Sequence, residues 1–118
     1  MAKVVFICNG AEVSNIFPPL ILGADAAASG DEVILFYGPE GAPVLVKGKL
    51  EEMREAKGYP DPVELYEGIR KLGGKIYVCA LALEVKDLKK EDFREGVEII
   101  GPTTFMNGIK DATITFSF

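Results

Sequence analysis

Cys79 and Cys8 are the two side chains of this sequence that could act as sulfur nucleophiles. Cys79 ends an apolar segment that starts at Gly74, and the stretch Ala80–Leu88 that follows is typical of a helix or of a tight loop entering one. In open α/β sheets, ligands bind beyond the carboxyl ends of the strands, and free N–H groups of a following helix stabilise a thiolate. This position favours thiol chemistry at Cys79. The alternative is simple packing, because free cysteine is among the most buried residue types.

The chain contains no histidine. This absence removes the commonest general base near neutral pH, every Ser-His or Cys-His dyad, and the commonest metal ligand. Two cysteines alone do not make a typical structural zinc site, and the acidic residues lack the spacing of a calcium loop. The sequence therefore disfavours hydrolase chemistry and predicts no metal site.

Length, charge and composition limit the number of domains and the kinds of partner that we expect. With 118 residues, of which 48% are apolar, the chain is long enough for one domain with its own core, which we expect over residues 1–118. Thirteen basic residues against eighteen acidic ones give a net charge of −5, and no basic run is present, so we expect no nucleic-acid binding. No leader or bilayer-spanning run is recognisable, and two cysteines do not imply a disulfide scaffold. We therefore expect a cytoplasmic protein with no membrane partner.

Apolar runs alternate with amphipathic stretches along the chain, which predicts successive βαβ units and a parallel sheet. The expected strands are Val4–Cys8, Glu32–Tyr37, Ile76–Cys79, Val97–Ile100 and Ala112–Phe118. The last of these alternates Thr and Ser with Ile and Phe, as a half-exposed edge or interface strand does.

Capping residues set the expected helix boundaries. Ser14 or Asn15 is a good cap for a first helix that stops at Gly30, and Asp61 caps a helix that begins at Pro62 and ends at residues 73–74. Between the second strand and this helix the connection is long and uneven. Such a connection covers a site, forms an interface, or is an ordinary extra helix on the sheet.

The segment after the first strand does not favour a dinucleotide. Cys8–Ala11 lacks the required glycine spacing, and Pro18 and Pro19 fit only in the first turn of the helix, where they remove N–H donors. We therefore expect no Rossmann-type cofactor.

Several polar residues are expected at the carboxyl edge of the sheet. Asn9 and Gly10 follow the first strand, Cys79 ends the third, and Thr103 and Thr104 open the last helix, where they could act as caps. Together they outline a crevice that could bind a small ligand. Cys8 also ends a strand there. If the strands of Cys8 and Cys79 flank the second strand, they lie about 9 to 10 Å apart, too far for a disulfide, so we assign Cys8 to packing.

Much of the chain resembles the DsrE/DsrF-like family, particularly its small single-domain members labelled predicted peroxiredoxins. The resemblance rests on Ile76–Cys79, Leu88–Gly96, Val97–Phe105 and the Thr-Ile-Thr-Phe ending, and in the first half on Asn15–Gly30, Asp31–Tyr37 and Gly41–Gly48. The segment Cys79–Phe105 is its most specific part. The Thr-x-x-Cys context of true peroxiredoxins is absent around both cysteines.

The resemblance implies a three-layer α/β/α fold on a five-stranded, mainly parallel sheet, assembled as homo-trimers or hexamers. It also implies that Cys79 accepts sulfur as a persulfide from a donor protein and passes it to an acceptor protein. That chemistry needs a thiolate and a protected pocket but no histidine, metal or cofactor. Here Ala80–Leu83 offers no side-chain donor beside the sulfur, so we expect backbone dipoles, or a nearby cation such as Lys47 or Lys49 of the covering loop, to lower the thiol pKa.

Three functions remain open at this point. The chain is a persulfide carrier or sulfurtransferase that uses Cys79, a small-ligand-binding module, or an oligomeric interaction protein without chemistry. Thiol reactivity separates the first from the other two.

Overall fold

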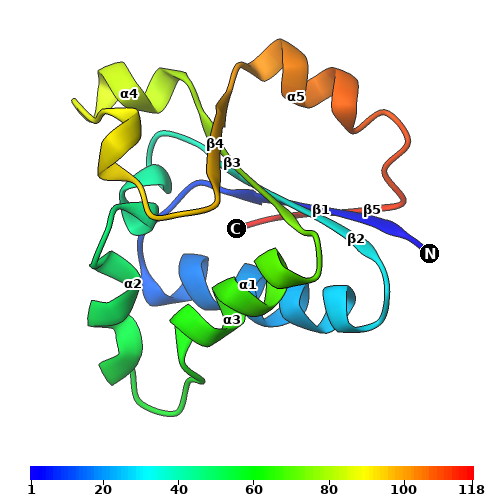
Figure 1. The fold of residues 1–118 in the computed structure, drawn as a ribbon, viewed down its shortest axis with the longest axis horizontal. Helices are drawn as coiled ribbons and strands as arrows, with labels where there is room; N and C mark the ends of the chain where they lie inside the picture. Colours follow the sequence, from blue (N-terminus) through cyan, green and yellow to red (C-terminus); the bar gives the residue numbers. More distant parts are fainter.

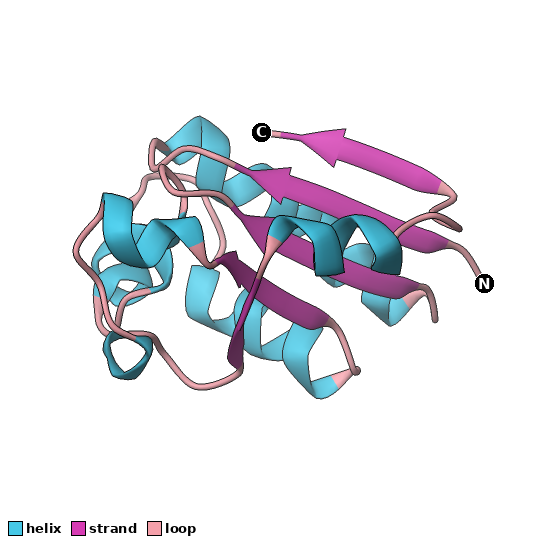
Figure 2. Ribbon diagram, turned by 90° about the horizontal axis from the view of Figure 1, so that it is seen from above, coloured by secondary structure: helices cyan, strands magenta, loops and turns pink.

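The sheet has five strands, all parallel, in the order β4-β3-β2-β1-β5 (Figures 1 and 2). The computed structural model describes residues 1–118. The strands are β1 (Lys3–Cys8), β2 (Glu32–Tyr37), β3 (Lys75–Cys79), β4 (Val97–Ile100) and β5 (Ile114–Ser117). The α/β class predicted from the sequence is confirmed, and the sheet is parallel throughout.

Five α-helices connect and cover these strands: α1 (Val13–Ala28), α2 (Lys49–Glu52), α3 (Pro62–Lys71), α4 (Leu81–Val85) and α5 (Pro102–Gly108). Single 3-10 turns lie at Ala42–Leu45, Met53–Glu55 and Lys90–Asp92. None of these helices has the length and apolar character needed to cross a membrane.

The direction of each crossover decides which face its helix covers. The chain moves from β1 through β2 to β3 in one direction, with α1 and α3 on one face, and then returns from β4 to β5 in the opposite direction through α5 (Figure 1). Because crossovers between parallel strands are right-handed, this reversal puts α5 on the other face. The three layers are therefore α1 and α3, the sheet, and α5.

Side chains alternate between the two faces along each strand, and they form two separate clusters. The larger has 20 buried residues, including those of α1 and α3 that face the sheet. The smaller has five, of which four come from the strands. From outside the sheet this small cluster is covered only by Phe105 of α5 and by Ile109 and Ala112 just after it. Figure 2 shows α5 in front of the middle of the sheet and no helix in front of β5.

The strands expected from the sequence agree closely with the structure. β2 and β4 have the expected bounds, and β1 and β3 each begin one residue earlier than expected. β5 is shorter than the expected run but is an edge strand, and its Ile114 and Phe116 are 43% and 37% exposed. The Asp61 cap is also confirmed, since its carboxylate accepts a hydrogen bond of 2.9 Å from the Val63 N–H.

The expected start of the first helix is wrong. α1 begins at Val13 with Glu12 as its N-cap, and the Asn15 side chain, three residues on, accepts a hydrogen bond of 3.1 Å from the Glu12 N–H. Pro18 and Pro19 consequently lie in the second turn of the helix. The prolines therefore do not remove the N–H groups of the first turn, and this argument against a dinucleotide-binding loop is lost. The argument from the missing glycine spacing still holds.

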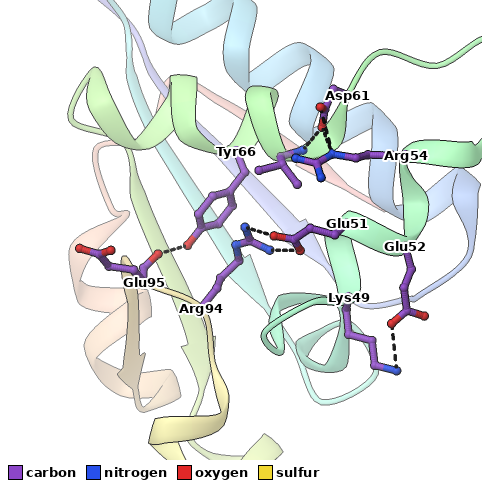
Figure 3. Close-up of polar contacts among 9 residues, drawn as sticks. Lys49, Glu51, Glu52, Arg54, Asp61, Tyr66, Arg94 and Glu95 are labelled. Atoms are coloured by element: carbon purple, nitrogen blue, oxygen red, sulfur yellow. Dashed lines mark hydrogen bonds and ion pairs between the residues drawn. The ribbon is translucent and has the colours of Figure 1, made fainter.

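A polar network fastens the long β2–β3 connection to the segment before β4 (Figure 3). Arg94 makes two hydrogen bonds to the Glu51 carboxylate, 3.1 and 3.2 Å long, and its guanidinium lies 4.9 Å from the centre of the Tyr66 ring. The Tyr66 hydroxyl donates to the Glu95 carbonyl at 2.8 Å. Backbone hydrogen bonds join the same segments, from Lys47 N–H to the Asp92 carbonyl and from Arg94 N–H to the Leu45 carbonyl.

The Glu51–Arg94 pair makes stability depend on pH. The hydrogen bond from Arg94 holds the pKa of Glu51 below its ordinary value. Its stabilisation is therefore fully present above that ordinary value and is lost as the pH falls through the lowered pKa. At pH 7 we expect Glu51→Gln to lower the free energy of unfolding by about 1 kcal/mol. This figure is modest because the Glu51 side chain is 40% exposed.

Urea unfolding of wild type and Glu51→Gln at neutral pH and below pH 4 measures this difference, which should shrink at the lower pH. Glu55→Gln is the matched control on the same connection, because Glu55 is exposed and makes no ion pair. An equal loss in Glu51→Gln at both pH values would contradict the assignment.

Candidate functional site at Cys79

Cys79 is the last residue of β3 and pairs in register with Ile100 at the end of β4. Its side chain is 4% exposed and belongs to the small cluster, whose other buried members are Val5, Ile34, Phe36 and Phe105. No hydrogen bond or ion pair involves the thiol. The sulfur is thus held at the carboxyl edge of a central strand in an apolar environment.

α5 provides the cover over this cluster. The Phe105 ring stacks on the Phe36 ring with centroids 3.9 Å apart and an angle of 11° between planes. At the carboxyl end of α5, the Lys3 ammonium donates to the carbonyl of Gly108, the last residue of the helix, and to the Asp111 carboxylate just beyond it, the latter at 2.8 Å. A single short helix with an anchor at its far end therefore separates this face of the sheet from solvent.

Cys8 lies on the opposite face. It belongs to the large cluster, is 1% exposed, and burial raises the pKa of its thiol to about 12. Because β1 and β3 flank β2 and the two side chains point to opposite faces, the thiols cannot form a disulfide without rearrangement of the sheet. Packing explains Cys8 fully.

Asn9 and Gly10 lie at the carboxyl end of β1, where the fold itself uses them. The Asn9 side-chain oxygen accepts a hydrogen bond of 3.3 Å from the Glu40 N–H. A Cβ atom at Gly10 would collide with the Asn15 side chain, and one at Gly41 with the Cys8 carbonyl. These residues let two loops approach each other closely, and no hydrogen bond joins Asn9 or Gly10 to Cys79.

The remaining predicted residues are spread around the molecule. Thr103 and Thr104 are exposed in α5 and do not cap it, because the N-cap is Gly101 and makes no side-chain bond. Thr104 lines a cavity of about 220 Å3 between α5 and the sheet, together with Tyr77 and Phe105. Lys47 is exposed and follows Val46, which packs on the large cluster and so on the face opposite the Cys79 side chain.

Sequence reasoning missed the residues that cover and brace this site. Phe105 was visible only as an apolar residue in the last helix, and Arg94 only as one charge among several. A pairing of Phe105 with Phe36 follows from the sheet register and the α5 crossover, neither of which a single sequence displays. No group of three His, Cys, Asp or Glu side chains lies together as metal ligands do.

Comparison with known proteins gives a consistent picture. Residues 42–116 match the model of the DsrE/DsrF/DrsH-like family. The chain is 33% identical over 73 residues to the uncharacterized protein MJ0760 of Methanocaldococcus jannaschii, a match that covers 62% of this chain but only 26% of that protein. This chain thus spans about a quarter of the length of that curated relative.

Two solved structures have the same fold. The crystal structure of the ychN protein from E. coli superimposes with a TM-score of 0.81 at 19% identity, covering 100% of both chains. The structure of MTH1491, a protein of unknown function from Methanobacterium thermoautotrophicum, superimposes with a TM-score of 0.74 at 13% identity, covering 98% of this chain and 99% of that one.

The α5 cover predicts how fast Cys79 reacts with a thiol reagent. Phe105→Ala removes the ring that stacks on Phe36, so we expect Cys79 to be alkylated by iodoacetamide at least several times faster than in wild type. Leu88, which packs on the other face, gives the matched control Leu88→Ala. Peptide mass analysis after timed alkylation identifies which cysteine is labelled. Unchanged labelling of Cys79 in Phe105→Ala would show that α5 does not limit access.

Proposed function

Because the chain belongs to the DsrE/DsrF/DrsH-like family, we propose that it carries sulfur as a persulfide on Cys79. One observation supports this choice above the others: Cys79 ends a central strand beneath a thin cover, whereas Cys8 is enclosed in the large core. A carrier thiol must be shielded from water yet reachable by a partner. Cys79 meets both requirements if α5 moves.

Transfer of sulfur from a persulfide donor to Cys79 requires no oxidant, reductant or further co-reactant. The Cys79 thiolate attacks the outer sulfur of a persulfide donor, R–S–SH. A bond forms between Cys79 Sγ and that sulfur, the S–S bond of the donor breaks, and R–S⁻ leaves with the electron pair and takes up a proton from solvent. An acceptor thiolate then attacks the outer sulfur of the Cys79 persulfide, and the Cys79 thiolate is released.

The surroundings of the sulfur suit storage. The apolar cluster that includes Phe36, Ile100 and Phe105 keeps this end of the sheet dry, and no side chain makes a hydrogen bond to the thiol. Exclusion of water slows loss of a bound sulfur to small reductants in solution. Release to a partner then depends on displacement of α5, so access and protection are controlled by the same helix.

Intact-mass analysis after incubation with polysulfide tests the proposal. Wild type and Cys8→Ser should each gain sulfur in 32 Da steps that dithiothreitol removes, since that is about the mass of one sulfur atom. Cys79→Ser should gain none. Equal gain in Cys79→Ser and Cys8→Ser would contradict the site, and no gain in wild type would favour the ligand-binding or interaction function.

Self-association is the second part of the proposal. β5 is an edge strand whose Ile114 and Phe116 are partly exposed, and exposed edges with apolar side chains are covered in stable proteins by a neighbour. We propose a homo-trimer or hexamer, as the family resemblance implies.

Multi-angle light scattering at micromolar concentration measures this state. We expect wild type to be larger than a monomer and Phe116→Lys to shift toward the monomer, because a charge on the edge disfavours strand contacts. Leu72→Lys is the control, since Leu72 is 61% exposed beyond the end of α3. A strictly monomeric wild type would exclude the assembly while leaving the sulfur chemistry open to its own test.

A further inference from the structure

A second cavity, of about 230 Å3, lies away from Cys79, where the β1–α1 loop meets the long β2–β3 connection. Its lining is mainly apolar. The apolar lining residues are Ala11 in the loop before α1, Ile16 in α1, Pro43 and Val44 in the 3-10 turn Ala42–Leu45, and Met53 in the 3-10 turn Met53–Glu55. Ile16 and Val44 are buried and form its floor. The space is smaller than the roughly 300 to 1,000 Å3 of pockets for drug-sized ligands, so it suits a small metabolite.

The rim of this cavity carries one cation and one anion. Lys49 and Glu52 both line it and form an ion pair with 3.8 Å between the ammonium and the carboxylate. Both side chains are more than half exposed, at 54% and 67%. An exposed pair of this length contributes little to stability, so its partners can be exchanged at small cost.

The wall that holds these charges is fixed from its other side. Figure 3 shows Glu51 of α2 pointing to Arg94, while Lys49 and Glu52 point away from that contact. Leu50, between them in sequence, is completely buried. α2 is thus braced by its buried side, and its exposed side presents the two charges to the cavity at a defined place.

We propose that this cavity binds a free α-amino acid with an apolar side chain of about the size of leucine or methionine. The carboxylate of the ligand pairs with Lys49 and its ammonium group with Glu52. Its side chain lies on the floor formed by Ile16, Val44 and Met53. The cavity lies between the connections that follow β1 and β2, beyond the carboxyl ends of these strands, and open α/β sheets bind ligands at that edge.

The paired charges favour a zwitterion over a singly charged ligand. A ligand with only a carboxylate would pair with Lys49 and leave Glu52 without a partner. A ligand with only an ammonium group would pair with Glu52 and leave Lys49 without one. An α-amino acid replaces the ion pair with two new ones and leaves no charge alone. Burial of a hydrophobic side chain on the apolar floor adds to the binding affinity, so leucine should bind more tightly than glycine.

Titration of 15N-labelled protein with L-leucine, followed by amide chemical shifts, tests the site. We expect saturable shifts at Ala11, Val44 and Met53 with a dissociation constant on the order of 1 mM. 4-Methylpentanoate, 3-methylbutylamine and glycine each lack one of the three recognised groups, so each should bind at least about tenfold more weakly. L-Methionine should resemble leucine.

Two variants and a control sharpen the result. Lys49→Ala and Glu52→Ala should each weaken leucine binding about fivefold or more, since each removes one pairing partner. Lys57→Ala should bind like wild type, because Lys57 is exposed and does not line the cavity. Ala11→Leu, which fills the mouth of the cavity, should abolish the shifts in a protein whose spectrum remains dispersed.

Cys79→Ser should bind leucine as wild type does, so this experiment is independent of the sulfur chemistry. The absence of saturable shifts up to about 10 mM would overturn the proposal. So would equal binding of leucine and of the two singly charged analogues.

Discussion

The fold depends on the alternation of side chains across a fully parallel sheet. Each strand presents successive residues to opposite faces, and crossovers of fixed hand assign α1 and α3 to one face and α5 to the other. Cys8 and Cys79 end different strands at the same edge of the sheet, yet this alternation directs their side chains to opposite layers. One thiol is enclosed in the large core, and the other lies beneath a single short helix.

The two faces of the sheet are covered unequally and therefore differ in how easily they open locally. The α1/α3 face is closed by long helices with many buried side chains, while the α5 face relies on one aromatic stack and an anchor at Lys3. Local opening costs least where few apolar contacts must be broken. A reactive group that must be protected and yet reached is best located on such a face, and Cys79 is there.

Much of this architecture follows from the sequence because its strands are short apolar runs with clear ends, and because Asp61 before Pro62 is an unambiguous cap. The sequence predicts Pro18 and Pro19 in the first turn of α1, but they lie in the second. A helix tolerates prolines there when packing around them compensates for the lost backbone hydrogen bonds. The partners of Arg94 could not be predicted. Glu51 is 43 residues away and Tyr66 belongs to another helix, so only the folded chain brings them together.

The pairing of β1 with β5 has a consequence for how the protein is made. Lys3 and Thr113 are joined by two hydrogen bonds across 110 residues of sequence. Synthesis of that length takes roughly 5 to 20 seconds. During this interval β1 can pair with β2 but leaves its other edge open, which is a template for contact with a nascent neighbour. Completion of the sheet is therefore a late, high-contact-order step, and chaperone protection matters most before β5 arrives.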